Sequence, residues 1–257
     1  MNSLQCYMTG KLNLRLATIV VLLLSLSRVP LIGAAEYIVG VETINYKPYY
    51  YLENGEYHGF ARELFDGFSQ YSGHSFTFRP LPINRLYEEF RNEKIDFKFP
   101  DNPNWGSDEK RGLTVLYSDP VVGFIDGVLT LSSRDCENTP LKSLGYVRGF
   151  TPWPYLPDIE KKKLKAVQVN ALESLLKMVK AGRIEAAFVN ISVAHALMKD
   201  MQITKDELSF SEGCPHDASN YLLSTKRYSD VVTQFNEYLA SSKVATLRSQ
   251  YNLEVNE

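Results

Sequence analysis

Aromatic rings are the groups in this sequence with the clearest chemical potential. The stretch YKPYYYLENGEYHGF, residues 46–60, holds seven ring side chains, counting His58, and two glycines in fifteen positions. An aromatic ring offers a flat apolar face whose electron density attracts cations. Such rings suit a flat, cationic or sugar-like ligand. We expect an aromatic-lined cleft formed by Tyr46, Tyr50, Trp105, Phe150 and Trp153.

Groups suited to catalysis are scarce by comparison. The four histidines are scattered, and none stands in a Ser-His-Asp order or at a metal-ligand spacing from a cysteine. No glycine loop of the phosphate-binding type is present. Glu42 and Asp108 are the only candidates for an acid–base group with a tuned pKa. We therefore predict that the protein is not an enzyme and has no catalytic residues, no metal site and no cofactor.

The first 35 residues have the pattern of a cleaved secretory signal peptide. They contain Lys11, Arg15 and Arg28 but no acid, and the apolar run LATIVVLLLSLS lies among them. This run is shorter than the roughly 20 residues that a spanning helix needs, and GAA at 33–35 offers the small residues that a signal peptidase requires. We expect cleavage after Ala35 and a periplasmic location, with an uncleaved N-terminal anchor as the alternative.

The remaining 222 residues (257 − 35) carry 25 basic (28 − 3) and 30 acidic side chains, a formal charge near −5. No basic cluster interleaves with aromatic residues, and EKKKLK at 160–165 has the pattern of a solvated helix face, so nucleic acid is not an expected partner. Cys136 and Cys214 remain once Cys6 leaves with the signal peptide. In an oxidising compartment an even pair suggests a disulfide, with two free buried thiols as the alternative.

Strands and helices alternate from Tyr37 onward. Candidate strands at 37–42, 75–81 and 94–99 are separated by candidate helices at 60–73 and 83–93. This βαβαβ order predicts an α/β sheet with right-handed crossovers. Three phenylalanines at helical spacing are expected to pack in the core, namely Phe60, Phe65 and Phe68.

A second α/β series follows the polar loop at 100–112. An extended segment is expected at 121–133, then strands at 144–150 and 184–190 with a helix at 171–182 between them. A strand at 220–226 and a helical segment at 230–252 complete the chain. Two α/β series without a flexible linker predict two lobes in close apposition.

The order of these motifs resembles the periplasmic solute-binding proteins of the amino-acid type, the bacterial extracellular solute-binding protein family 3. That family opens approximately as G-x-D, Y-x-P-F-x-Y, G and G-F. Residues 40–60, GVETINYKPYYYLENGEYHGF, follow the same order with one extra residue before the tyrosine. The resemblance implies that Tyr46 covers the ligand, that Pro48 fixes a turn, and that Gly55 and Gly59 stand at a turn and at a helix start.

Two further segments carry the resemblance. Residues 95–123 are similar to the family's D-A-x…T-x-x-R-x6-F-S-x-P-Y, which implies that Arg111 grips a ligand carboxylate through its planar guanidinium. LGYVRGFTPW at 144–153 resembles V-G-V-x-x-G-T-T, which implies an anion-binding turn at Thr151. GRIEAAFVN at 182–190 resembles G-K-x-D-A-x-x-x-D, which implies that Asn190 faces the ligand's ammonium group.

Several positions depart from the family pattern. Asn190 stands where the family has an acid, and Gly106 and Asp108 stand where hydroxyl residues often assist the arginine. Ile83 replaces a ring that often faces Tyr46, and Arg85 could enter the cleft instead. Glu42 either supplies the missing negative charge or lies at the rim. These changes are coherent only if the ligand is not an ordinary free α-amino acid.

The resemblance implies an α/β, two-lobed type II periplasmic binding fold, each lobe a mixed sheet flanked by helices, with two hinge crossovers. We expect lobe 1 at 36–121 and 217–257 and lobe 2 at 122–216. The implied function is capture of a small polar, carboxylate-bearing ligand by hinge closure of a monomer, for the permease of an ABC importer. The alternatives are a sensing module for a membrane receptor and a lyase or dehydratase on the same fold. The expected ligand-binding residues are Glu42, Tyr46, Arg85, Trp105, Arg111, Phe150, Thr151 and Asn190.

Overall fold

The computed structural model describes residues 34–131 and 134–256. The predicted signal peptide lies outside these residues, apart from Ala34 and Ala35. From Ala35 onward the chain forms one compact unit, and its first strand begins at Glu36. Among the described residues, no helix combines the length and the apolar character needed to cross a membrane.

The first group of elements is the predicted βαβαβ series. Strands β1 (Glu36–Glu42), β4 (Ser75–Leu81) and β5 (Phe97–Asp101) are parallel, with β1 between the other two, and α2 (Phe60–Ser72) and α3 (Ile83–Arg91) connect them. The three phenylalanines of α2 are buried, as their helical spacing predicts. Gly73 ends α2 in the left-handed conformation that favours glycine.

Three details of the predicted first lobe were not foreseen from the sequence. A short hairpin, β2 (Tyr51–Glu53) and β3 (Glu56–His58), turns at Asn54 and Gly55, and β6 (Leu116–Tyr117) is a two-residue strand. The expected single helical segment at 230–252 is two helices, α7 (Ser229–Leu239) and α8 (Ser242–Gln250). The break falls at two serines, which favour helix starts over helix interiors.

The second group of elements forms the other part of the mixed sheet. It contains β7 (Val122–Thr130), β8 (Ser143–Val147), β9 (Lys165–Val169), β10 (Ala186–Asn190) and β11 (Ser209–Phe210). Its helices are a 3₁₀ turn (Trp153–Tyr155), α4 (Leu156–Glu160), α5 (Leu172–Lys180) and α6 (Ile191–Asp200). The predicted helix at 160–165 is wrong: α4 ends at Glu160 and Lys165 begins β9. Buried Leu164 ties this turn to the core while the flanking lysines stay exposed.

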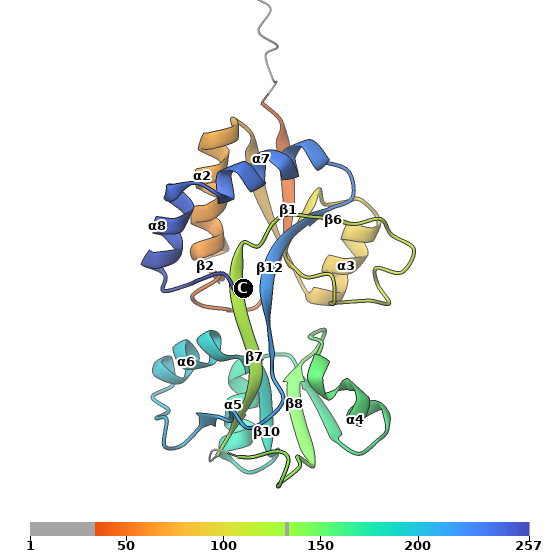
Figure 1. The fold of residues 1–257 in the computed structure, drawn as a ribbon, viewed down its shortest axis with the longest axis vertical. Helices are drawn as coiled ribbons and strands as arrows, with labels where there is room; N and C mark the ends of the chain where they lie inside the picture. The colour runs from red at the N-terminus through yellow and green to blue at the C-terminus, as the bar shows by residue number, and fades with distance from the viewer. Residues whose placement is uncertain (1–33, 132–133, 257) are drawn as a thin grey trace, which may run out of the picture. The chain divides into compact units, whose positions relative to one another are not determined.

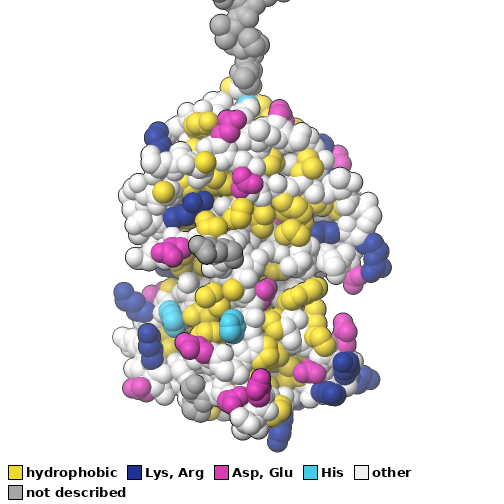
Figure 2. Space-filling model, in the orientation of Figure 1, with side chains coloured by type: hydrophobic (Ala, Val, Ile, Leu, Met, Phe, Trp, Pro, Cys, Tyr) yellow, Lys and Arg dark blue, Asp and Glu magenta, His cyan; other side chains and the backbone are white. Residues whose placement is uncertain are grey.

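Two long strands join the groups. Strand β12 (Asp217–Thr225) pairs antiparallel with β5 in the first group and with β7 in the second, so a single sheet runs through both. Figure 1 shows β7 and β12 side by side between the two groups. Figure 2 shows the surface narrowing at this level, with hydrophobic side chains on both sides. The two-lobed α/β fold is confirmed, and we propose the lobe boundaries of the sequence analysis, which coincide with the starts of β7 and β12.

Cys136 and Cys214 form a disulfide, with their Cα atoms 4.8 Å apart. Cys214 belongs to a cluster of buried side chains in the second lobe that includes Leu141 and Phe188, and the partly buried Cys136 packs against this cluster. The disulfide predicted from the sequence is thereby confirmed.

Candidate ligand-binding site

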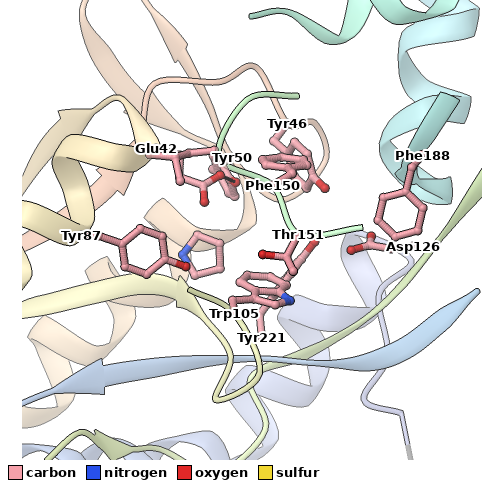
Figure 3. Close-up of a pocket in the computed structure, with 13 residues that line it drawn as sticks. Glu42, Tyr46, Tyr50, Tyr87, Trp105, Asp126, Phe150, Thr151, Phe188 and Tyr221 are labelled. Carbon is pink, nitrogen blue, oxygen red and sulfur yellow. Dashed lines mark hydrogen bonds between the residues drawn. The ribbon is translucent and has the colours of Figure 1, made fainter. Parts of the chain in front are cut away.

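A pocket lies where the two lobes meet; it spans about 450 Å³ when open solvent is counted, and the centre of a water molecule can reach about 30 Å³ of it. The first lobe contributes the ends of β1 and β5 and the segment around Tyr46, and the second contributes β7, β10 and the turn after β8. Figure 3 shows the lining side chains converging from these elements. Seven of them are rings, namely Tyr46, Tyr50, Tyr87, Trp105, Phe150, Phe188 and Tyr221.

Five of the eight predicted ligand-binding residues line this pocket: Glu42, Tyr46, Trp105, Phe150 and Thr151. Tyr46 stacks on Tyr50 with ring centroids 5.3 Å apart, and Phe150 of the other lobe meets Tyr46 edge to face at 5.8 Å. Trp153 is 43% exposed and lies outside the lining, so it does not join the aromatic cleft.

The other three predicted residues lie elsewhere. Arg111 donates to Asp108, and both side chains are about 80% exposed. Arg85 pairs with Glu89, with 3.2 Å between Nε and Oε1, on the surface of α3. Asn190 is buried behind the lining, where its Nδ2 donates to the Tyr221 hydroxyl at 3.2 Å.

Lys110, the basic residue next to Arg111, points into the protein. Lys110 donates from Nζ to Asp101 Oδ1 at 2.7 Å, and Lys98 donates to the same oxygen at 3.0 Å. Asp101 also accepts from Ser224 Oγ at 2.6 Å. Together these partners hold the pKa of Asp101 below its usual range against the opposing effect of burial. Sequence reasoning missed this buried cluster, although a lysine inside the apolar strand FKFPD was the available signal.

Glu42 lies at the carboxyl end of β1 and is buried. Its Oε2 accepts the hydroxyl hydrogen of Tyr50. Burial raises the pKa of Glu42, and the nearby positive charge of Lys98 opposes that rise. Glu42 is therefore a wall residue of the pocket with its own neighbours in the protein, rather than a rim residue.

Asp126 is the second acid of the pocket and was not singled out from the sequence. It stands in the middle of β7, and its Oδ1 is enclosed without a hydrogen-bond partner among the described residues. Burial, reinforced by the negative charge of Asp217, raises the pKa of Asp126 to about 8. An acid within the apolar run VVGFIDGVLT was the sequence signal for it.

Glu42 and Asp126 are the two carboxyl groups among the described lining residues. No group of three or more His, Cys, Asp and Glu side chains could hold a metal ion there. Of the two acid–base candidates, Asp108 is exposed and outside the pocket, and Glu42 alone lies within it.

Comparisons with known proteins identify the fold. No protein-family model and no curated protein matches the sequence. Among solved structures, the chain is similar to a histidine kinase sensor domain that resembles periplasmic binding proteins, with a TM-score of 0.73 and 16% identity over 86% of this chain and 98% of that one. The chain therefore has the type II periplasmic binding protein fold.

Two neighbours with the same fold are named for the ligands that they bind. The arginine-binding protein of T. maritima, solved as a mutant, has a TM-score of 0.66 and 18% identity over 84% of this chain and 95% of that one. The arginine-, lysine- and histidine-binding protein ArtJ of Geobacillus stearothermophilus has a TM-score of 0.65 and 14% identity, over 84% and 94%. These neighbours are binding proteins and a sensor domain, and their identities establish the fold alone.

Proposed function

We propose that this protein captures a small polar organic ligand in the pocket between its lobes and presents it to a membrane partner. The observation that carries the proposal is that each lobe supplies part of the lining. Glu42, Tyr46 and Trp105 come from the first lobe, and Asp126 and Phe150 come from the second. A ligand held by both lobes favours the closed state, because it loses half of its contacts when the lobes part.

The proposed partner is the permease of an ABC importer, and the proposed location is the periplasm. The signal-peptide pattern and the disulfide, which forms in oxidising compartments, support that location. We further propose that the protein works as a monomer without nucleic acid, metal or cofactor. The likeness to a histidine kinase sensor domain supports a second candidate, a sensing module that reports the ligand to a membrane receptor.

The prediction that the ligand carries a carboxylate rested on Arg111, which is exposed and paired with Asp108. Arg148 is the arginine nearer to the site, since it lines a groove that shares Thr151 and Phe150 with the pocket. We therefore propose that any carboxylate of the ligand is received at this groove or by a turning of Arg111. Replacing each arginine with alanine separates the two cases.

The first test is a melting-temperature screen of refolded protein against amino acids, amines, organic acids and small sugars. A ligand at about a hundred times its dissociation constant adds roughly 2.7 kcal/mol, or about 5–10 °C for a chain of this size. Solution scattering should then show a smaller radius of gyration with the ligand bound. If no compound shifts the melting curve and native mass spectrometry of the unrefolded protein finds no bound molecule, the binding function is wrong.

Importer and receptor roles are separated in cells. Deleting the gene should abolish uptake of the labelled ligand in the first case. In the second, it should abolish a transcriptional response to the ligand and leave uptake intact.

A further inference from the structure

We propose that the ligand of this pocket is an organic cation, an ammonium or guanidinium compound, whose charged group rests on Asp126 among the aromatic rings. The inference rests on the proposed binding function and adds the chemical class of the ligand. It begins with the charges of the lining, where two carboxyl groups are present and no Lys, Arg or His is found among the described lining residues.

The two acids differ in what already neutralises them. Glu42 lies near the ammonium group of Lys98 and accepts a hydrogen bond from Tyr50. The buried charges beside it balance, since Lys98 and Lys110 face Asp101 and Glu42. Glu42 therefore needs no cation from the ligand.

Asp126 has no positively charged neighbour among the described residues, and a hydrogen bond from Asn190 only partly offsets the effect of its burial. In the sheet it lies opposite Asn190 of β10 and opposite Asp217 of β12, an amide and a second acid. The other titratable groups that act on it are acids, Glu42 and the hydroxyls of Tyr46, Tyr49 and Tyr221. A half-buried carboxyl without a positive partner, with its enclosed Oδ1 unbonded, is matched by a cation that enters from the pocket.

The rings complete the site. Figure 3 shows Phe188 beside Asp126, with Tyr46 and Phe150 above and Trp105 and Tyr221 below, while Glu42 lies at the far side of the pocket. Aromatic faces around a desolvated cation stabilise it through their quadrupoles, a mode of recognition typical of quaternary ammonium ligands. The same walls give a carboxylate ligand nothing positive to pair with.

This arrangement couples binding to a proton. The ligand-free carboxyl of Asp126 keeps its proton up to about pH 8, because burial and Asp217 disfavour its charge. A bound cation favours the carboxylate, so binding should release a proton and tighten by about tenfold per pH unit until that pH is reached. An anionic ligand would show the opposite slope, since a protonated carboxyl can donate to it.

The test measures dissociation constants by calorimetry on the refolded full-length protein between pH 6 and 9. The probes are tetramethylammonium, choline and agmatine, with 3,3-dimethylbutan-1-ol as the neutral counterpart of choline. Quaternary probes keep their charge at every pH, so any slope belongs to the protein. We expect at least one cation to bind, more tightly than the neutral alcohol and with an affinity that rises with pH.

Asp126→Asn should weaken the cation at least tenfold at pH 8.5 and flatten the pH profile. Asp217→Asn is the matched control on the paired strand; it should retain binding and move the profile to lower pH. Melting curves without ligand show whether each variant is folded. The inference is overturned if no cation binds, or if the dissociation constant of the cation changes neither with pH nor in the Asp126→Asn variant. If anions or neutral solutes bind instead, only this inference fails, whereas no binding by any solute of the wider panel removes the proposed function as well.

Discussion

Asn190 lies directly opposite Asp126 in the antiparallel pairing of β10 with β7, and it performs two structural tasks there. Its Oδ1 accepts the Val193 N–H at 3.0 Å and so caps α6, while its Nδ2 donates to Tyr221 in the pocket wall. Behind the lining, Asn190 thus orients a ring that faces the pocket.

Asn190→Ala should therefore destabilise the protein by about 2 kcal/mol, since a lost cap costs roughly 1 kcal/mol and a lost buried hydrogen bond a similar amount. Urea denaturation at pH 6 measures this loss, which should grow slightly toward pH 8 and above, because Asn190 also hydrogen-bonds to Asp126 and favours its carboxylate. Asn190→Asp is the informative partner variant, because it keeps the capping oxygen but places an acid against Asp126. Its cost should grow as pH rises, and equal pH dependence of the two variants would contradict this account.

Asp101 is the residue whose loss should harm folding most. Asp101→Asn leaves two buried lysines without their shared carboxylate, and breaking a buried ion pair costs about 3–5 kcal/mol. Because the pKa of Asp101 is lowered, its contribution is complete at neutral pH and disappears as the pH falls below its usual range near 4. Asp108→Asn is the control in the same loop, exposed and expected to stay within about 0.5 kcal/mol. Chemical denaturation at pH 7 and pH 3.5 compares the two, and similar losses at pH 7 would refute the assignment.

Asp126 should have the opposite effect on stability in the absence of ligand. Its pKa is raised, so the native state holds a proton that the unfolded state releases, and stability falls as pH rises from about 4 to about 8. Asp126→Asn removes this fall in stability, so the stability of the variant should gain on that of the wild type by at most about 1.4 kcal/mol per pH unit. The melting temperature of the variant should exceed that of the wild type increasingly toward pH 8. A constant difference across this range would show that the carboxyl is already charged.

We expect Gly149 to set how closely the lobes can approach. It has a φ of 91°, and a Cβ atom there would lie 2.8 Å from Ile83 Cγ2, a residue of the other lobe. Gly149→Ala should therefore hold the lobes apart, giving a larger radius of gyration in solution scattering and a weaker affinity for ligand. Gly55→Ala is the control, since its φ is also positive and no atom would meet its Cβ. An unchanged profile for Gly149→Ala would show that the lobes have room to spare.

The disulfide should contribute about 2–4 kcal/mol, because it closes a loop of 78 residues in the unfolded chain. Replacing both cysteines with alanine should lower the melting temperature by roughly 5–15 °C. Adding reductant to the wild type should reproduce the shift and leave the double variant unaffected. A reductant effect of equal size on both proteins would point to another cause.

The local patterns of the sequence predicted most of the fold. Apolar periodicity located α2, α3, α5 and the strands around them, because helical and strand spacing are visible within a few residues. Two errors concern the lengths of helices. The helix LPDIE has only five residues and ends at Glu160, and the serines at 241 and 242 divide a long helical pattern into two helices.

The site was predicted less completely, for a physical reason. Motif order led to Tyr46, Phe150 and Thr151, which line the pocket, and their role in ligand binding stays a prediction. In the loop that follows β5, the buried carboxylate of Asp101 selects which basic side chain points inward. Only the folded chain shows that Lys110 binds this carboxylate, while Arg111 stays on the surface. Asp126 was overlooked because its importance comes from neighbours on two other strands.

The position of the disulfide gives the second lobe a covalent boundary. Cys136 follows the end of β7 and Cys214 precedes the start of β12, so nearly the whole lobe lies within one closed ring of chain. A protease that cuts once inside this ring yields two fragments that remain attached to each other. The nicked protein would migrate as a single species on a non-reducing gel and separate into two bands only after reduction, so an exposed turn such as 160–163 can be cleaved without releasing either half of the ligand site.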